Sequence, residues 1–164
     1  MSRWSENLMT LLDGRATMVE TERGPIQVAR EGDGPRVMSI HGSPGGFDQG
    51  LVWAQHLRDG GRELIAPSRP GYLRTPLDSG RSPAQQADLY AAMLDALHID
   101  KVTVLGISSG GPSAVHFAAR HPSRTNALLL DAAVLLPIAP ASNEIERAIL
   151  ESGTGIWLSC QIAK

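Results

Sequence analysis

The chain reads Val-Thr-Val-Leu-Gly-Ile-Ser-Ser-Gly-Gly at residues 102–111, and this stretch decides the fold. Its first four residues are β-branched or apolar, which predicts a short buried strand. The glycines after them indicate a turn, and a helix is expected over residues 112–120, until Pro122 stops it. A strand that turns directly into a helix is typical of parallel sheets with helical crossovers, so the stretch predicts an α/β fold.

The segments on either side of this stretch repeat the alternation of strand and helix. Short apolar runs at residues 37–40, 63–66 and 127–130 predict three more strands. Helices are expected between them, over residues 49–58 and over residues 83–97, and apolar residues recur at helical spacing in the second of these. We therefore expect a mostly parallel sheet with helices on both faces.

Two local signals support this arrangement. A Gly-Pro pair at residues 24–25, between strand-like segments at 17–21 and 26–29, predicts a β-hairpin. Ser82 stands at the N-cap of the helix that follows it, and Gln85 stands three residues later, so a capping box is expected there.

The bulk composition excludes several classes of function. Hydrophobic residues make up 42% and charged residues 20% of the 164 residues, the balance of a soluble globular protein. The formal net charge of -2 implies no basic face, so no nucleic-acid partner is expected. Cys160 is the single cysteine, which excludes an internal disulfide and a cysteine-based metal site, and neither a metal nor a cofactor is expected. No segment predicts a signal peptide or a membrane span, so the expected location is the cytoplasm.

The sequence pattern changes beyond Pro140. Residues 1–140 are expected to form the core of the fold, whereas residues 141–164 are expected to begin a cap or an irregular tail. Within this second segment, residues 144–150 have a helical pattern and residues 151–164 have no clear period.

Gly106-Ile107-Ser108-Ser109-Gly110 matches the pattern G-x-S-x-G between a predicted strand and a predicted helix. The turn is so tight that side chains two residues either side of the serine would collide, which explains the flanking glycines. Ser108 Oγ then stands clear of the sheet as a candidate nucleophile. The Ser109 N–H, at the start of the helix, is a candidate donor to an oxyanion. The alternative for Ser108 is a structural serine in a tight turn.

A second oxyanion donor is expected from the glycine-rich loop at residues 41–46, which follows a predicted strand. The backbone N–H of Ser43 is the candidate, and a plain loop residue is the alternative. His41 is expected to brace this loop through hydrogen bonds. For Arg69, in the next loop, two interpretations remain open: contact with an acidic substrate group, or a salt bridge that braces the loop.

Three motifs occur in the order and spacing of α/β-hydrolase-fold proteins: His-Gly-Ser-Pro-Gly-Gly at 41–46, Ser-Arg-Pro-Gly-Tyr at 68–72 and Gly-Ile-Ser-Ser-Gly-Gly at 106–111. Residues from about 15–135 resemble the N-terminal portion of these proteins. The resemblance implies hydrolysis of a small-molecule ester, amide or related acyl substrate by a Ser-His-Asp triad. Leu73 departs from the family, where many members carry glycine, and leaves the subfamily open.

The triad of this family is ordered Ser, then an acid, then His. After Ser108 the sequence contains only two histidines, His116 and His121. His116 lies two turns along the predicted helix, and His121 is expected to cap carbonyl groups at the end of that helix. Asp131, at the end of the next predicted strand, is either a triad acid or a residue that caps the following turn.

We therefore expect the chain to stop before the residues that complete the site, so that the fold is incomplete at its C-terminus. An incomplete sheet would leave one edge uncovered and open to self-association. Without a histidine, Ser108 keeps its proton, so the isolated chain is expected to be weakly active or inactive. The alternative function is a non-catalytic binding or dimerisation module. A nucleotide-binding domain is disfavoured, because Ser108 replaces the middle glycine of G-x-G-x-x-G.

Overall fold

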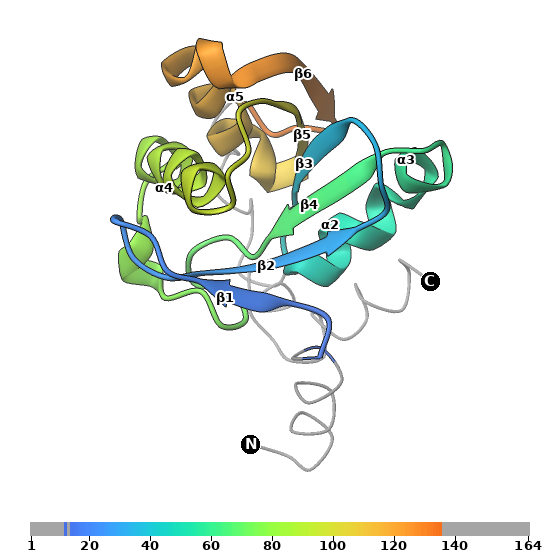
Figure 1. The fold of residues 1–164 in the computed structure, drawn as a ribbon. Coiled ribbons are helices and arrows are strands. Elements are labelled where there is room, and N and C mark those ends of the chain that lie inside the picture. Colours follow the sequence, from blue (N-terminus) through green and yellow to red (C-terminus); the bar gives the residue numbers. More distant parts are fainter. Residues whose placement is uncertain (1–11, 13, 136–164) are drawn as a thin grey trace, which may run out of the picture.

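The computed structural model describes residue 12 and residues 14–135. A mixed β-sheet forms the centre of this part of the chain (Figure 1). Its strands in this part are β1 (Thr17–Val19), β2 (Ile26–Glu31), β3 (Arg36–Ile40), β4 (Glu63–Pro67), β5 (Val102–Ile107) and β6 (Thr125–Asp131). The strand order is β1-β2-β4-β3-β5-β6. The strands from β4 to β6 run parallel, whereas β1 and β2 are antiparallel to their neighbours. The mostly parallel sheet is confirmed, and the segment expected over residues 141–164 lies outside the described residues.

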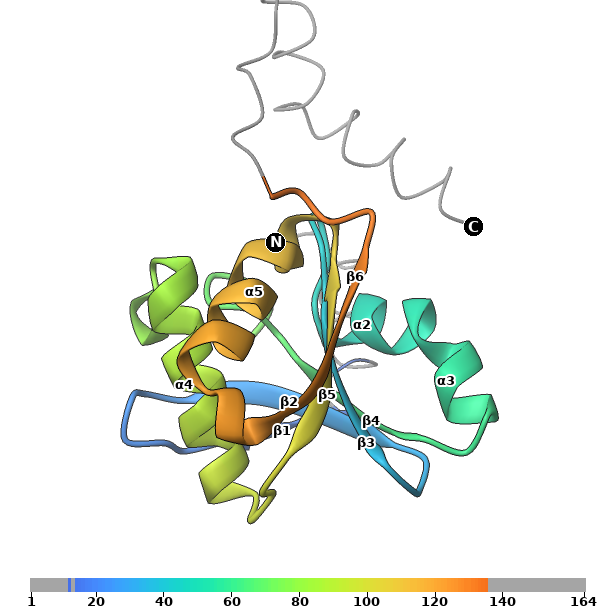
Figure 2. The same ribbon diagram turned by 90° about the horizontal axis from the view of Figure 1, so that it is seen from above.

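Helices cover both faces of the sheet (Figure 2). One face carries α2 (Phe47–Trp53) and α3 (Gln55–Asp59), and the other carries α4 (Pro83–Ala96) and α5 (Gly111–Arg120). The single helix expected over residues 49–58 is wrong. The first helix begins earlier, because the buried Phe47 donates its N–H to Ser68 Oγ at 3.2 Å, and Ala54, at φ -92° and ψ 8°, separates α2 from α3. No helix of the described residues is long and apolar enough to cross a membrane.

Each face of the sheet has its own apolar core. Successive residues of a strand point to opposite faces, and β5 shows the consequence. Val102 and Val104 join the core beneath α4 and α5, together with Phe117, whereas Leu105 and Ile107 join the core beneath α2. Burial on both faces fixes the register of the central strands. Their carboxyl ends therefore meet at one edge of the sheet, the usual place for a ligand in such folds.

The loop after β4 is tied to β2 through Gln27, which is buried. The Gln27 N–H donates to Thr75 Oγ1 at 2.9 Å, and Gln27 Oε1 accepts a hydrogen bond from Ser68 Oγ at 3.1 Å. Ser68 and Thr75 are also buried. Both ends of the loop at residues 68–75 are therefore fixed to one strand. This loop lies beside the carboxyl ends of the central strands.

Thr75→Val is expected to lower the free energy of unfolding by about 1–3 kcal/mol, because the Gln27 N–H would stay buried without an acceptor. Thr103→Val is the matched control, since Thr103 is half-buried on β5 and its hydroxyl has no hydrogen bond in the described part of the chain. Urea unfolding of the two variants measures the difference. Equal stabilities would contradict the role assigned to Thr75.

Candidate active site

Ser108 lies between β5 and α5, at the start of a short 3-10 turn (Ser108–Gly110). Its φ is 48°, in the left-handed region that residues other than glycine rarely occupy. Such a backbone costs on the order of 1–3 kcal/mol and persists only where the surrounding structure enforces it. The Val134 N–H donates to the Ser108 carbonyl oxygen at 2.9 Å. The turn therefore has the strained geometry that the G-x-S-x-G pattern predicts.

Two glycines allow this turn to approach the rest of the fold. A Cβ atom at Gly110 would lie 2.4 Å from the Ile40 carbonyl oxygen and 2.6 Å from that of His41. A Cβ atom at Gly106 would lie 2.6 Å from Ala114 Cβ. Backbone carbonyls cannot move aside as the end of a flexible side chain can. Glycine is therefore required where the serine turn meets the end of β3.

The Ser108 side chain is partly exposed, and its hydroxyl has no hydrogen-bond partner among the described residues. The glycine-rich loop after β3 lies against it, because a Cβ atom at Gly42 would be 3.0 Å from Ser108 Cβ. The backbone N–H groups of Ser43 and Ser109 donate to no acceptor in the described part of the chain. The structure thus brings to the same edge of the sheet a hydroxyl and two amides that pair with none of the described residues.

Gln49, which the sequence did not single out, braces the glycine-rich loop. Its Oε1 accepts the Gly42 N–H at 2.8 Å, and its Nε2 donates to the Pro44 carbonyl oxygen at 2.6 Å. These two bonds hold the residues on either side of Ser43, so they fix the position of its amide. The one signal in the sequence is a polar residue in the first turn of the helix that follows the loop.

His41 is fully buried, and both of its ring nitrogens are engaged. Nε2 accepts the Arg69 N–H at 2.9 Å, so the imidazole proton lies on Nδ1, which donates to the Gly42 carbonyl oxygen at 2.7 Å. Burial lowers the pKa of His41 to about 4; the Gly42 hydrogen bond opposes this shift and the charge of Arg69 adds to it. His41 is therefore a neutral brace between two loops, as expected, and it does not serve as a base for Ser108.

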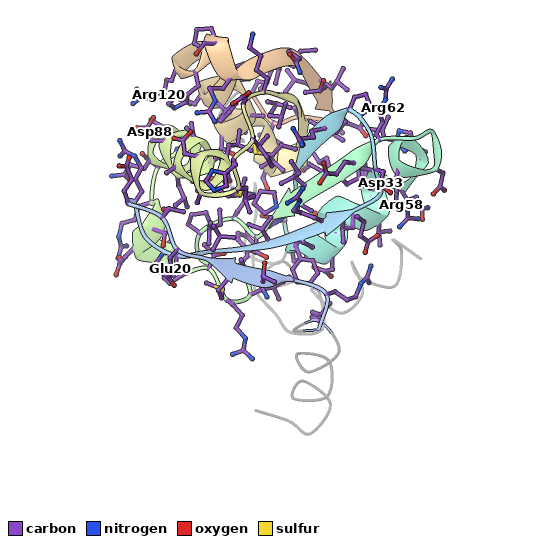
Figure 3. The ribbon with its side chains drawn as sticks, viewed as in Figure 1. Glu20, Asp33, Arg58, Arg62, Asp88 and Arg120 are labelled. Carbon is purple, nitrogen blue, oxygen red and sulfur yellow. The ribbon has the colours of Figure 1, made fainter. Side chains whose placement is uncertain are left out.

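The other histidines also lie apart from the Ser108 hydroxyl. His121 Nε2 lies 2.9 Å from Asp88 Oδ1, and Arg120 binds the same carboxylate, which joins α5 to α4 (Figure 3). His121 is the C-cap of α5, as expected, and its backbone N–H donates to the Phe117 carbonyl oxygen at 2.8 Å, whereas its ring turns to the Asp88 carboxylate. His116 is exposed on α5. No histidine of the described residues forms a hydrogen bond with Ser108.

Asp131 ends β6 and lies opposite Ile107 in the register of β5 and β6. The acid therefore stands one strand away from the serine turn. Its Oδ2 accepts a hydrogen bond from Trp53 Nε1 at 2.6 Å. Neither interpretation of Asp131 from the sequence anticipated this indole partner on α2.

Arg69 forms no ion pair with a described residue, so none of these residues supplies the salt bridge that was one of its two interpretations. Its Nη1 donates instead to Ser109 Oγ at 2.9 Å and to the His41 carbonyl oxygen at 3.4 Å, and its Nε is buried without an acceptor. Among the described residues, the partners of the guanidinium are therefore neutral oxygens. Among residues 12 and 14–135, no three histidine, cysteine, aspartate or glutamate side chains are grouped so that they could hold a metal ion.

Lowering the pH from 7 to 5 is expected to destabilise the fold through His41. An unfolded histidine titrates near pH 6.5 and folded His41 near pH 4, so the unfolded state binds the extra proton in this window. The contribution of His41 to the free energy of unfolding is therefore complete above about pH 6.5. It is lost as the pH falls toward 4, by up to about 3 kcal/mol. Urea unfolding at a series of pH values measures this loss.

His41→Gln is expected to be less stable at pH 7 but to have a flatter pH dependence, since glutamine forms hydrogen bonds without titrating. His116→Gln is the matched control and should keep the slope of the unaltered chain, because His116 is exposed on α5. An unchanged slope in His41→Gln would show that another group causes the pH dependence.

Comparisons with known proteins agree with this geometry. Residues 35–152 match the model of the alpha/beta hydrolase fold family. The uncharacterized hydrolase YcgS of Bacillus subtilis (strain 168) is 35% identical over 120 residues, which cover 73% of this chain and 42% of YcgS. The 2-hydroxy-6-oxo-6-phenylhexa-2,4-dienoate hydrolase of Burkholderia cepacia is 33% identical over 114 residues, which cover 64% of this chain and 38% of that enzyme.

A solved structure is similar over most of the chain. The alpha/beta hydrolase fold protein from Nakamurella multipartita superposes with a TM-score of 0.80 at 41% identity, over 90% of this chain and 52% of that chain. The chain thus spans about two fifths of the length of these two curated relatives. From the family match and the shared fold, the chain belongs to the α/β-hydrolase fold family.

Proposed function

We propose that the chain is part of a serine hydrolase that cleaves ester, amide or related acyl substrates through Ser108. One observation carries the proposal: a hydroxyl held at φ 48° lies at the same edge of the sheet as the N–H groups of Ser43 and Ser109, and all three lack a hydrogen-bond partner among the described residues. The N-terminus of α5, which follows directly, adds a positive dipole end that favours negative charge.

In the proposed reaction, Ser108 Oγ attacks the acyl carbonyl carbon while a base takes its proton. The carbonyl oxygen becomes an oxyanion, which the Ser43 and Ser109 N–H groups hold by hydrogen bonds. The intermediate collapses, and the alcohol or amine leaves with a proton. Water then hydrolyses the acyl-serine, which restores the hydroxyl. One oxyanion donor typically accelerates such a reaction by about 10²–10³-fold.

The described residues supply the oxyanion donors without a base at Ser108. Both nitrogens of His41 are engaged, and His121 binds Asp88. Oxyanion binding alone leaves roughly 10³–10⁴-fold catalysis over water in serine hydrolases that lack part of the triad. We therefore expect these 164 residues to turn over an ester slowly or not at all.

Membership of the α/β-hydrolase fold family does not by itself select one class of substrate. The Burkholderia cepacia relative is named for the hydrolysis of a dienoate, which favours a small-molecule substrate here as well. The single cysteine suits a reducing compartment, from which we infer the cytoplasm as the location.

Added imidazole is expected to accelerate covalent labelling of Ser108 by a fluorophosphonate, because free imidazole stands in for the missing base. The Ser108 oxygen bonds to phosphorus, fluoride leaves, and imidazole takes the proton. The rate should rise with imidazole concentration, and peptide mass spectrometry should find the label on Ser108.

Ser108→Ala should abolish this labelling. Ser123→Ala is the matched control and should keep it, since Ser123 is exposed in the turn after α5. Labels spread over several exposed serines, or a rate at Ser108 that ignores imidazole, would mean that this hydroxyl is structural.

A specific observation supports a second candidate function, a non-catalytic module that self-associates. β6 is the last strand in the order, and its outer edge pairs with no strand of the described residues. Leu129 and Leu130 on this strand are 43% and 41% exposed. An open edge with apolar side chains is a surface on which a second copy can add its own strand.

The second candidate predicts dimers at micromolar concentration, measured by analytical ultracentrifugation. Leu129→Lys should shift the equilibrium to monomers, because a charge on an edge strand opposes pairing. Leu77→Lys should leave the dimer intact, since Leu77 is equally exposed but lies in the 3-10 turn (Leu77–Ser79) before α4. A monomer at every concentration would reject self-association.

A further inference from the structure

The side chains around Ser108 form a continuous row of hydrogen bonds that the proposed reaction leaves unused. Arg69 Nη1 donates to Ser109 Oγ at 2.9 Å, and Ser109 Oγ donates to Ser43 Oγ at 2.9 Å. Ser43 Oγ in turn is hydrogen-bonded to the Tyr72 hydroxyl. This hydroxyl row of Arg69, Ser109, Ser43 and Tyr72 ends at the surface, because Ser43 is exposed and Tyr72 is half-buried. In the proposed reaction Ser43 and Ser109 act only through their backbones.

Arg69, the first member of the hydroxyl row, determines which group donates in each of the next hydrogen bonds. Arginine has only donors, so the Ser109 hydroxyl accepts a hydrogen bond from Arg69 and donates one to Ser43 Oγ. Ser43 and Tyr72 then hold two hydroxyl protons, and the bond between them uses one. One O–H group at the outer end of the row therefore has no acceptor in the described residues, whichever of the two hydroxyls carries it.

The charge of Arg69 is not neutralised by a carboxylate of the described residues. Its other neighbours are the His41 carbonyl oxygen at 3.4 Å and the Tyr72 ring, whose centroid lies 5.4 Å from Arg69 Cζ. A cation at one end of a row of hydroxyls polarises each O–H toward the other end. The unpaired O–H is therefore suited to an acceptor that carries negative charge.

We propose that the outer end of the hydroxyl row binds a carboxylate on the acyl part of the substrate, with the Tyr72 hydroxyl as a specificity-determining contact. The inference rests on the proposed function, because it takes Ser108 as the point from which the acyl group extends. Hydrogen bonds to an ionised acceptor are about twice as strong as those between neutral groups. Half-esters of dicarboxylic acids are therefore the favoured substrate class.

Two phosphonates that differ only at the end of one alkyl chain test this subsite on the 164-residue chain. Both are ethyl p-nitrophenyl alkylphosphonates, one ending in a carboxylate and the other in a methyl group. Ser108 Oγ bonds to phosphorus, p-nitrophenolate leaves, and added imidazole takes the hydroxyl proton. The release of p-nitrophenolate, corrected with Ser108→Ala, gives the labelling rate for each phosphonate.

The unaltered chain should react faster with the anionic phosphonate. Tyr72→Phe should lower the ratio of anionic to neutral labelling about tenfold, because the phenyl ring cannot donate to the carboxylate. Ser109→Ala keeps its backbone N–H but separates the outer hydroxyls from Arg69, so the ratio should fall as well. Ser123→Ala is the matched control: it removes an exposed hydroxyl in the turn after α5, outside the hydroxyl row, and the ratio should stay the same.

Two failures are distinguishable. If both phosphonates label Ser108 at equal rates, or if neither Tyr72→Phe nor Ser109→Ala changes the ratio, the carboxylate subsite is wrong and the proposed function stands. If neither phosphonate labels Ser108, the proposed function fails and the subsite fails with it. Circular dichroism establishes which variants are folded. If Tyr72→Phe does not fold, the labelling ratio of Ser109→Ala alone tests the carboxylate subsite.

Discussion

The contact between the serine turn and the end of β3 is the constraint on which the candidate site depends. No Cβ atom can be accommodated at Gly110, because the carbonyl oxygens of Ile40 and His41 already occupy that space. Strand pairing prepares this contact, since Ile40 lies opposite Gly106 in the register of β3 and β5. The spacing between the two loops is thus set by main-chain atoms. Oxyanion donors are effective when they are held in place before the charge develops, and a main-chain contact provides this.

A second constraint concerns charge. The Arg69 N–H occupies His41 Nε2, so a proton on that nitrogen would break the bond that joins the two loops. It would also place a second positive charge near the guanidinium, which together with burial holds the pKa of His41 low. The site therefore keeps one fixed cation, and that cation lies behind neutral hydroxyls. No carboxylate of the described residues cancels its charge.

Features that depend on neighbours in the chain could be predicted from the sequence. The capping box of Ser82 and Gln85 has both of its hydrogen bonds, at 3.2 Å and 3.0 Å, because its partners are three residues apart. The strand, turn and helix around Ser108 are local in the same sense. In contrast, Asp131 binds Trp53, which is far away in the sequence, and no spacing rule connects such residues. The partners of Arg69 could not be predicted for the same reason, because they depend on how two loops from different strands meet.

Binding of negative charge and removal of the serine proton have different structural requirements in this fold. The proposed oxyanion donors follow β3 and β5, so they come together as soon as these adjacent strands pair. A base must approach Ser108 Oγ with a side chain, and the pairing of β3 with β5 does not position one. The described residues therefore bring the N–H groups of Ser43 and Ser109 to the same edge of the sheet as Ser108 without a base. A catalytic domain needs this turn and a base that reaches Ser108 Oγ, whereas a module that self-associates through the open edge of β6 needs neither.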